Sequence, residues 1–289
     1  MLADRRLTGE RRQDDAVKIM SLDTSDGISL LGYAGLGKTA NGTQPADWMS
    51  RVLLGRNLTL ERSINVLAEE MTAQLPSHML GLPDADGPFH VVVIPPFVGT
   101  EPRLYGINLE ISPDRTRYRH GRGRGVFHPR PGIPKTLRAG IAGSGAEYLN
   151  RNTGWMRKVL RLVGAFDRGR ISSRTVADHL AKLNLEVHQN VGTVGPSCIV
   201  AWRLRRGITD KNGGQQFYTG TARDPSSPAL PSISQGLDVR AICQIMMPVM
   251  KEEFERFDAG EALDPTKLTA QLNARMARLY ARPPDRRLR

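Results

Sequence analysis

Hydrophobic positions in residues 15–39 predict two strands joined by a tight turn. Residues 17–22 are apolar apart from Lys18 and Ser21, and residues 28–33 form a second apolar run. The segment between them contains Asp26 and Gly27, which adopt the backbone angles that a short turn requires. The pattern therefore predicts a β-hairpin that ends in a glycine-rich segment, residues 34–39.

The remaining periodicity predicts an α+β protein with antiparallel sheets. Apolar residues recur at helical spacing in residues 47–54, 59–75, 171–190, 239–257 and 265–281. Short apolar runs predict strands at residues 89–94, 103–109, 139–142, 197–204 and 215–219. Hairpins and helix pairs alternate in blocks, which disfavours a parallel βαβ series.

Individual residues limit several of these helices. Thr59 is expected to cap the second helix and Pro76 to end it, and Ser172 or Ser173 is expected to cap the 171–190 helix. The expected buried face of that helix is formed by Val176, Leu180, Leu183 and Val187. An apolar face is also expected on the 239–257 helix, packed on the body or on a neighbouring subunit; it contains Ile242, Ile245, Met246, Val249, Met250, Phe254 and Phe257.

Composition and charge restrict the class of protein without choosing one. The chain has 289 residues, 39% of them hydrophobic, and a formal net charge of +12, which permits contact with nucleic acid or acidic lipid but does not require it. Cys198 and Cys243 lie far apart in sequence, which disfavours a disulfide framework, and Cys198 fits a buried strand position. We expect no metal site and no cofactor. The charged first residues do not resemble a signal peptide and no apolar run is long enough to span a bilayer, so we expect a soluble cytoplasmic protein that does not bind a membrane.

Residues 32–39, GYAGLGKT, match the P-loop pattern G-x-x-x-x-G-K-[ST]. A P-loop also needs a helix that opens at its Lys and Thr, because the amides of that helix complete the phosphate site. Here Gly42 and Pro45 predict a loop after Thr39, with the next helix beginning near Pro45. Nucleotide binding is therefore a minor alternative, and the free glycine amides could hold an oxyanion instead.

Residues 1–204 resemble a proteasome β-type subunit, a member of the N-terminal-nucleophile (Ntn) hydrolases. The resemblance rests on the order and spacing of LADRRLT (2–8), VKIM (17–20), AGL (34–36), VVVI (91–94), PRLYGI (102–107) and AGSG (142–145). It implies a four-layer αββα sandwich for residues 1–204 and a ring-type homo-oligomer. Residues 205–289 lie outside the resemblance and are expected to form a loop followed by a helical C-terminal extension.

The resemblance also implies a site for peptide hydrolysis. In this class an N-terminal Thr, Ser or Cys attacks the peptide carbonyl, and its own free amine serves as the base. By resemblance, Lys18 activates the nucleophile and Asp4 holds Lys18 in place. Gly35 would donate its backbone N–H to the oxyanion, and Ser144 would lie beside the amine.

Two features depart from the family pattern. Asn190 and Thr193 occupy positions where the family commonly has Asp and Ser, and an Asn cannot carry the same charge. The family nucleophile heads a strand that precedes the first strand here, whereas Thr8 is internal and offers no free amine. We therefore expect a threonine-type peptidase subunit that is inactive as written, with its true start upstream; the alternative is a non-catalytic ring or scaffold subunit.

Residues 112–138 are expected to form a basic loop. Arginines separated by glycines and aromatic residues can bind phosphate backbones and stack on bases, so nucleic-acid binding is a further alternative. A solvated loop or an acidic neighbouring subunit explains the run equally well. The basic residues are Arg115, Arg117, Arg119, Arg122, Arg124, Arg130, Lys135 and Arg138.

Overall fold

The structure is a computed structural model that describes residues 1–7, 13–35, 37, 42–78, 90–111, 118–125, 141–204, 213–226, 229–262 and 264–280. In its first half the elements are β1 (Leu2–Asp4), β2 (Ile19–Asp23), β3 (Gly27–Ala34), α1 (Pro45–Leu53), α2 (Leu60–His78), β4 (Val91–Ile94), β5 (Phe97–Val98), β6 (Glu101–Pro102), β7 (Leu104–Ile111) and β8 (Tyr118–Gly125). They are followed by α3 (Ala146–Arg151), α4 (Gly154–Asp167), α5 (Ser173–Asn190), β9 (Cys198–Arg203), β10 (Gly213–Thr219), β11 (Ala222–Asp224), β12 (Ser232–Ser234), β13 (Leu237–Asp238), α6 (Val239–Asp258) and α7 (Pro265–Tyr280). The chain is therefore an α+β protein, as the sequence predicts.

The larger sheet is organised around the predicted hairpin of β2 and β3. Its strand order is β13-β12-β2-β3-β4-β7-β8, and the small strands β5 and β6 extend from β3. Neighbouring strands are antiparallel except β12 and β2, which are parallel. The β2–β3 turn is tied to α2, because the Asp26 carboxylate accepts a hydrogen bond from the Leu60 amide at 2.8 Å. A local turn signal in the sequence thus also fixes where α2 begins.

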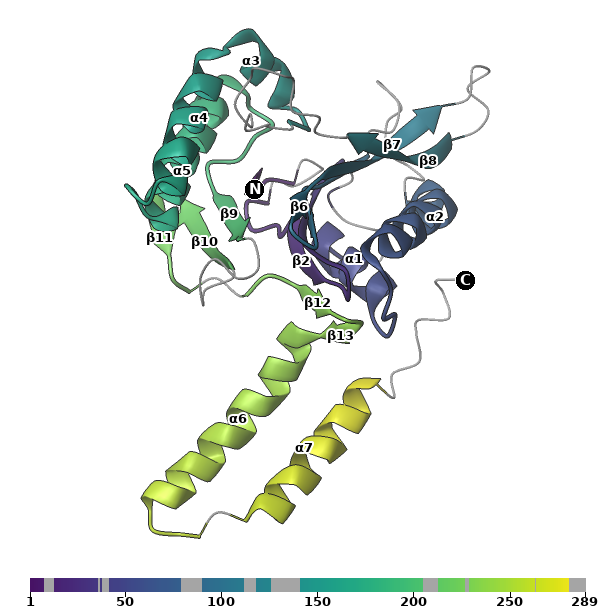
Figure 1. Cartoon of the computed structure of the whole chain (residues 1–289), viewed down its shortest axis with the longest axis vertical. Coiled ribbons are helices and arrows are strands. Elements are labelled where there is room, and N and C mark those ends of the chain that lie inside the picture. Colours follow the sequence, from purple (N-terminus) through teal and green to yellow (C-terminus); the bar gives the residue numbers. More distant parts are fainter. Residues whose placement is uncertain are drawn as a thin grey trace.

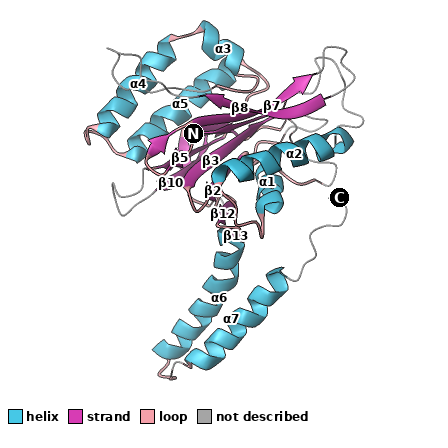
Figure 2. Ribbon diagram, turned by 45° about the vertical axis from the view of Figure 1, so that its right-hand side comes forward, coloured by secondary structure: helices cyan, strands magenta, loops and turns pink. Residues whose placement is uncertain are grey.

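The smaller sheet, in the order β1-β9-β10-β11, lies between the larger sheet and α5 (Figures 1 and 2). Successive side chains along its strands point to opposite faces of the sheet, and both faces are buried. Ile199, Ala201 and Phe217 pack into the main core with the larger sheet, α1 and α2. Cys198 and its same-face neighbours Val200 and Tyr218 pack instead against Ala177 and Ala181 of α5.

The buried face of α5 is displaced by one residue from the predicted one. Ser172 caps the helix as expected, accepting a hydrogen bond from the Thr175 amide. The buried residues are Ala177, Ala181, Asn184 and Val187, whereas Val176, Leu180 and Leu183 are only half-buried. Two alanines on the inner face let the helix approach the sheet closely, which moves the larger side chains to its flanks. A smaller difference concerns α2, which continues two residues past Pro76 to His78.

Three further expectations differ from the structure. Residues 118–125 of the expected basic loop form β8, which pairs with β7 along its whole length; the rest of 112–138 lies outside the described residues. The C-terminal segment expected from residue 205 contributes strands to both sheets before its helices begin at Val239. β10 pairs with β9 and β12 with β2, so backbone hydrogen bonding joins residues 213–234 to the body. Residues 141–142, expected at the end of a short strand, are not in a strand.

A carboxylate at the contact between α5 and the smaller sheet gives the fold a dependence on pH. The Arg223 guanidinium and then the Tyr218 hydroxyl donate hydrogen bonds to Asp178, and they hold the pKa of that carboxyl below its usual value. A depressed pKa contributes stability above the unfolded-state pKa, about 4, and that contribution is lost as the pH falls through the lower folded-state value. In urea titrations we expect Asp178→Asn to lower the unfolding midpoint at pH 7, by an amount that shrinks below about pH 4. A difference that grew on acidification would contradict this assignment.

No helix among the described residues is both long and apolar enough to cross a membrane.

Candidate active site

The predicted lysine–carboxylate pair forms where β1 ends and β2 begins. The Lys18 ammonium lies 3.1 Å from Asp4 Oδ2, and the two side chains are 15% and 23% exposed. Asp4 Oδ1 also accepts the Arg6 amide at 2.9 Å and the Gly195 amide at 3.3 Å. Two backbone donors and one cation therefore hold the carboxylate, and its position does not depend on Lys18 alone.

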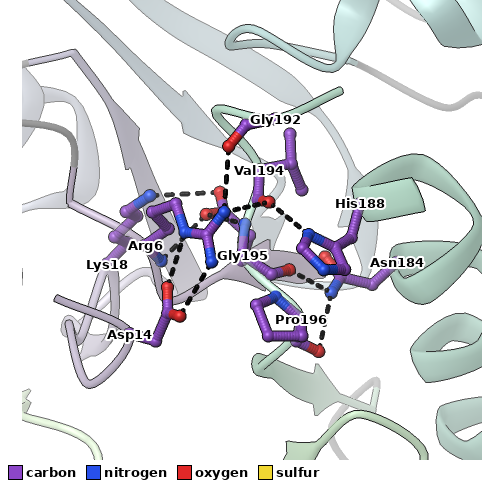
Figure 3. Close-up of polar contacts among 10 residues, drawn as sticks. Arg6, Asp14, Lys18, Asn184, His188, Gly192, Val194, Gly195 and Pro196 are labelled. Carbon is purple, nitrogen blue, oxygen red and sulfur yellow. Dashed lines mark hydrogen bonds and ion pairs between the residues drawn. The ribbon is translucent and has the colours of Figure 1, made fainter. Parts of the chain in front are cut away.

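Arg6 connects this pair to the turn that follows α5 (Figure 3). Its side chain is 9% exposed and makes a two-pronged ion pair with Asp14, at 2.8 and 2.9 Å. The same guanidinium donates to the carbonyl oxygens of Gly192, at 2.9 Å, and Val194, at 3.2 Å. Hydrogen bonding to Asp14 raises the pKa of Arg6 above its ordinary value, so the clamp stays charged at any physiological pH.

Side chains from α5 hold the other side of this turn (Figure 3). Asn184, 4% exposed, donates to the carbonyl oxygens of Gly195 and Pro196, and His188 Nδ1 lies 2.8 Å from the Val194 carbonyl oxygen. A side chain at position 195 would place its Cβ 2.8 Å from both the Arg6 Cβ and Asp14 Oδ1. Position 195 therefore requires glycine, because the backbone passes directly against the clamp.

The glycine turns predicted for the oxyanion and the amine lie next to each other. Gly35 follows β3 with φ 131°, and Gly143 has φ 94°, conformations that favour glycine. A Cβ at Gly143 would lie 3.5 Å from the Ala34 Cβ, and one at Gly145 would lie 3.4 Å from Val194. The 143–145 turn thus contacts both the end of β3 and the turn after α5. Ser144, at its centre, is exposed.

Close approaches of the backbone and hydrogen bonds therefore bring four of the six predicted site residues into one region. They run from Gly35 to Ser144 through Ala34 and Gly143, and from there to Asp4 and Lys18 through Val194 and Gly195. These residues come from three widely separated parts of the chain, so their meeting is a result of the tertiary fold.

The other two predicted residues do not direct their side chains to this site. The Asn190 amide is exposed and donates to the Glu186 carbonyl oxygen of its own helix at 2.8 Å. Thr193 is exposed, and only its neighbours Gly192 and Val194 contact Arg6. Residues 190–193 therefore lie beside the site, but the Asn190 side chain is bonded within the last turn of α5.

The sequence interpretation missed Arg6 and Asp14, which organise the site. The structure pairs them because Leu7 and Gln13 form a bridge that brings positions 6 and 14 opposite each other. An Arg and an Asp placed symmetrically about a short connection are candidates for such a pair.

Other chemistries find little support in the described residues. Cys198 is fully buried, as expected, and burial raises the pKa of its thiol to about 12, so it is not a nucleophile. No group of three His, Cys, Asp or Glu side chains among the described residues could hold a metal ion. The helix that follows the P-loop-like segment begins at Pro45, after the non-helical residues 42–44, whereas a P-loop helix starts at the Lys. Lys38 and Thr39 lie outside the described residues.

In the described part of the basic segment, one arginine, Arg122, contacts another element of the fold. Arg122 lies 3.7 Å from Glu61 and 3.4 Å from Asn65, both on α2, while Arg119 is exposed. Arg122 therefore joins β8 to α2. The other basic residues of 112–138, apart from Arg124, lie outside the described residues.

No protein-family model, curated protein or solved structure matches this chain.

Proposed function

We propose that this chain is a proteasome-like peptidase subunit of the Ntn class. The observation that carries the proposal is the Lys18–Asp4 pair, 3.1 Å apart and largely shielded from solvent. The sequence resemblance assigns Lys18 as the activator of the nucleophile and Asp4 as the carboxylate that holds it, and it does so without reference to their contact. The Gly35 and Ser144 turns, linked to the same pair by packing, supply the two further parts that the chemistry needs.

Packing between the layers agrees with the four-layer αββα arrangement that belongs to this proposal. α5 covers one face of the smaller sheet, and the other face of that sheet shares the main core with the larger sheet. α1 and α2 contribute to that core from the side of the larger sheet. These contacts support the proposal of helix, sheet, sheet and helix as successive layers.

We place the nucleophile on a strand that pairs with the open edge of β1. The Met1 ammonium donates to the Ala201 carbonyl oxygen of β9 and the Arg5 amide to that of Ser197, just before β9, so the backbone groups of Leu2 and Asp4 face the opposite edge. No strand among the described residues pairs there. A strand added at this edge would run beside Asp4, the partner of Lys18, and could present its first residue to the Lys18 ammonium.

The chemistry follows from these positions. The hydroxyl or thiol of the first residue attacks the peptide carbonyl, its proton passes to the free amine and then to the leaving amine, and an acyl-enzyme forms. Water then attacks the ester or thioester, which releases the acid and restores the nucleophile. Lys18 stabilises the developing alkoxide or thiolate, and the amides near Gly35 stabilise the oxyanion.

The proposal is tested on the protein made from its own locus, by intact mass, N-terminal sequencing and labelling with a peptide epoxyketone. This electrophile forms its ring adduct only when a nucleophilic side chain and a free amine belong to the same residue. We expect a mature chain headed by Thr, Ser or Cys and one label per chain. A chain that starts elsewhere and takes no label would exclude peptidase activity and favour a non-catalytic ring or scaffold subunit, which the orientation of Asn190 would also suit.

A further inference from the structure

Helices α6 and α7 form a hairpin that projects away from the body (Figure 1). α6 contacts the body chiefly at its start, through β12 and β13 and an ion pair of 3.5 Å between Arg240 and Asp47. Beyond that point α6 packs against α7. The hairpin therefore presents most of its surface away from the main core.

Two heptad stripes run along α6, offset from each other by one residue. The first contains the two buried residues of the helix, Val249 and Glu253; its members are Ile242, Met246, Val249, Glu253 and Arg256. The second keeps the same alternating spacing of four and three; its members are Cys243, Met247, Met250, Phe254 and Phe257. Such a stripe is the pattern by which one helix packs against another.

Among the described residues, the second stripe is largely uncovered: its central residue Met250 is half-buried and its other members are exposed. Met247 is 67% exposed, Phe254 55% and Phe257 57%. Of the described residues, all the exposed large hydrophobic side chains lie on α6 or just before it; the other two are Leu237 and Met246. A soluble chain rarely exposes so much apolar surface on one helix unless the surface is used for binding.

We propose that a second copy of this chain covers the stripe, with the two α6 helices antiparallel about a two-fold axis near Met250. The stripe is nearly symmetric about Met250, because Cys243 and Phe257 lie seven residues before and after it, while Met247 lies three residues before it and Phe254 four residues after it. An antiparallel partner therefore sets Cys243 against Phe257 of the other copy, and Met247 against Phe254. The order of sizes is self-complementary, because a small or flexible side chain meets an aromatic ring in each outer layer.

The opposite orientation fits less well. A parallel pair would stack Phe257 on Phe257 at one end and leave Cys243 opposite Cys243 at the other, which creates uneven layers. Charges beside the stripe do not oppose association, since Lys251 pairs with Glu255 of its own helix at 3.6 Å. With α7 behind each α6, the assembly is a four-helix unit, a stable arrangement for helices of this length.

The orientation is tested by disulfide trapping in the full chain carrying Phe257→Cys. Positions 243 and 257 are about 21 Å apart on one helix, too far for a bond within a chain. Under mild oxidation we expect a covalent dimer linked between Cys243 of one copy and the cysteine introduced at position 257 of the other, identified by peptide mass. The matched control is Glu252→Cys, an exposed position on another side of the same helix, which should give little dimer. Equal trapping in both variants, or a Cys243–Cys243 link in the unmodified chain, would overturn the antiparallel arrangement.

The interface itself is tested by sedimentation of the unmodified chain and of Met247→Glu. The charge enters the interface twice because of the two-fold axis, and we expect the dimer dissociation constant to rise about 100-fold. Glu255→Gln should leave it nearly unchanged. A chain that is monomeric at all concentrations would overturn the proposal, as would a monomer whose stripe binds anionic vesicles. Neither readout depends on peptidase activity, so this inference stands or fails separately from the proposed function.

Discussion

Under the proposed function, replacing Lys18 with alanine in a chain headed by the proposed nucleophile is expected to lower the rate of peptide hydrolysis by about 10²–10⁴-fold. The fold should survive the change. Asp4 keeps the amides of Arg6 and Gly195 as donors, so removal of the ammonium does not leave the carboxylate without a partner. The variant should therefore lose stabilisation of the transition state and keep its folding stability. The first is measured as kcat/KM for a fluorogenic peptide, and the second as the urea midpoint.

The matched control is Lys182→Ala, an exposed lysine on α5. It carries the same charge change and should alter neither rate nor stability. Hydrolysis that survives Lys18→Ala at more than about a tenth of the original rate would remove Lys18 from the site.

Replacing Arg6 with alanine is expected to destabilise the protein by about 2–4 kcal/mol. Arg6 is 9% exposed and donates to the Asp14 carboxylate and to two carbonyl oxygens of the turn after α5. Its removal leaves a void beside Gly195 and takes a donor from the Gly192 carbonyl oxygen. The Val194 carbonyl oxygen keeps its contact with His188, which limits the loss.

Urea titration measures this loss, with Arg174→Ala as control, an exposed arginine for which we expect a change within about 0.5 kcal/mol. Arg6→Lys should recover only part of the stability, since an ammonium cannot reproduce the two-pronged bond to Asp14. The two site variants should also differ in kind: Arg6→Ala lowers stability and rate together, whereas Lys18→Ala lowers the rate alone. An Arg6→Ala protein with unchanged stability would contradict the role of Arg6 as the clamp of the turn.

Local sequence signals were sufficient for most elements of this fold. The hairpin of β2 and β3 follows from two apolar runs around Asp26-Gly27, and the start of α1 follows from Pro45 after a glycine-rich segment. The cap of α5 at Ser172 and the bounds of α6 and α7 also agree closely with apolar spacing. These features depend on backbone geometry within a few residues, which is why the sequence reveals them.

Residues 118–125 and 232–234 show where such reasoning fails, whereas the strand predicted at residues 215–219 is confirmed as part of β10. Arginines and glycines give β8 no alternating apolar pattern, and its strand form comes from pairing with β7 and packing against α2. β12 is three residues long, and it is a strand only because its backbone pairs with β2, about 210 residues earlier. Hydrogen bonds to a distant strand leave no periodic trace in so short a segment.

By itself, the sequence determined the α+β class, the positions of the main helices and hairpins, and, through the resemblance, Lys18 and Asp4 as a candidate pair. Only the tertiary structure decided that this pair is in contact, that Arg6 and Asp14 clamp the turn beside it, and that Asn190 turns away. It also decided which of the two stripes of α6 is covered. The reason is physical: helix and turn formation depend on neighbouring residues, whereas the placement of a buried charge or an apolar stripe depends on segments that only the folded chain brings together.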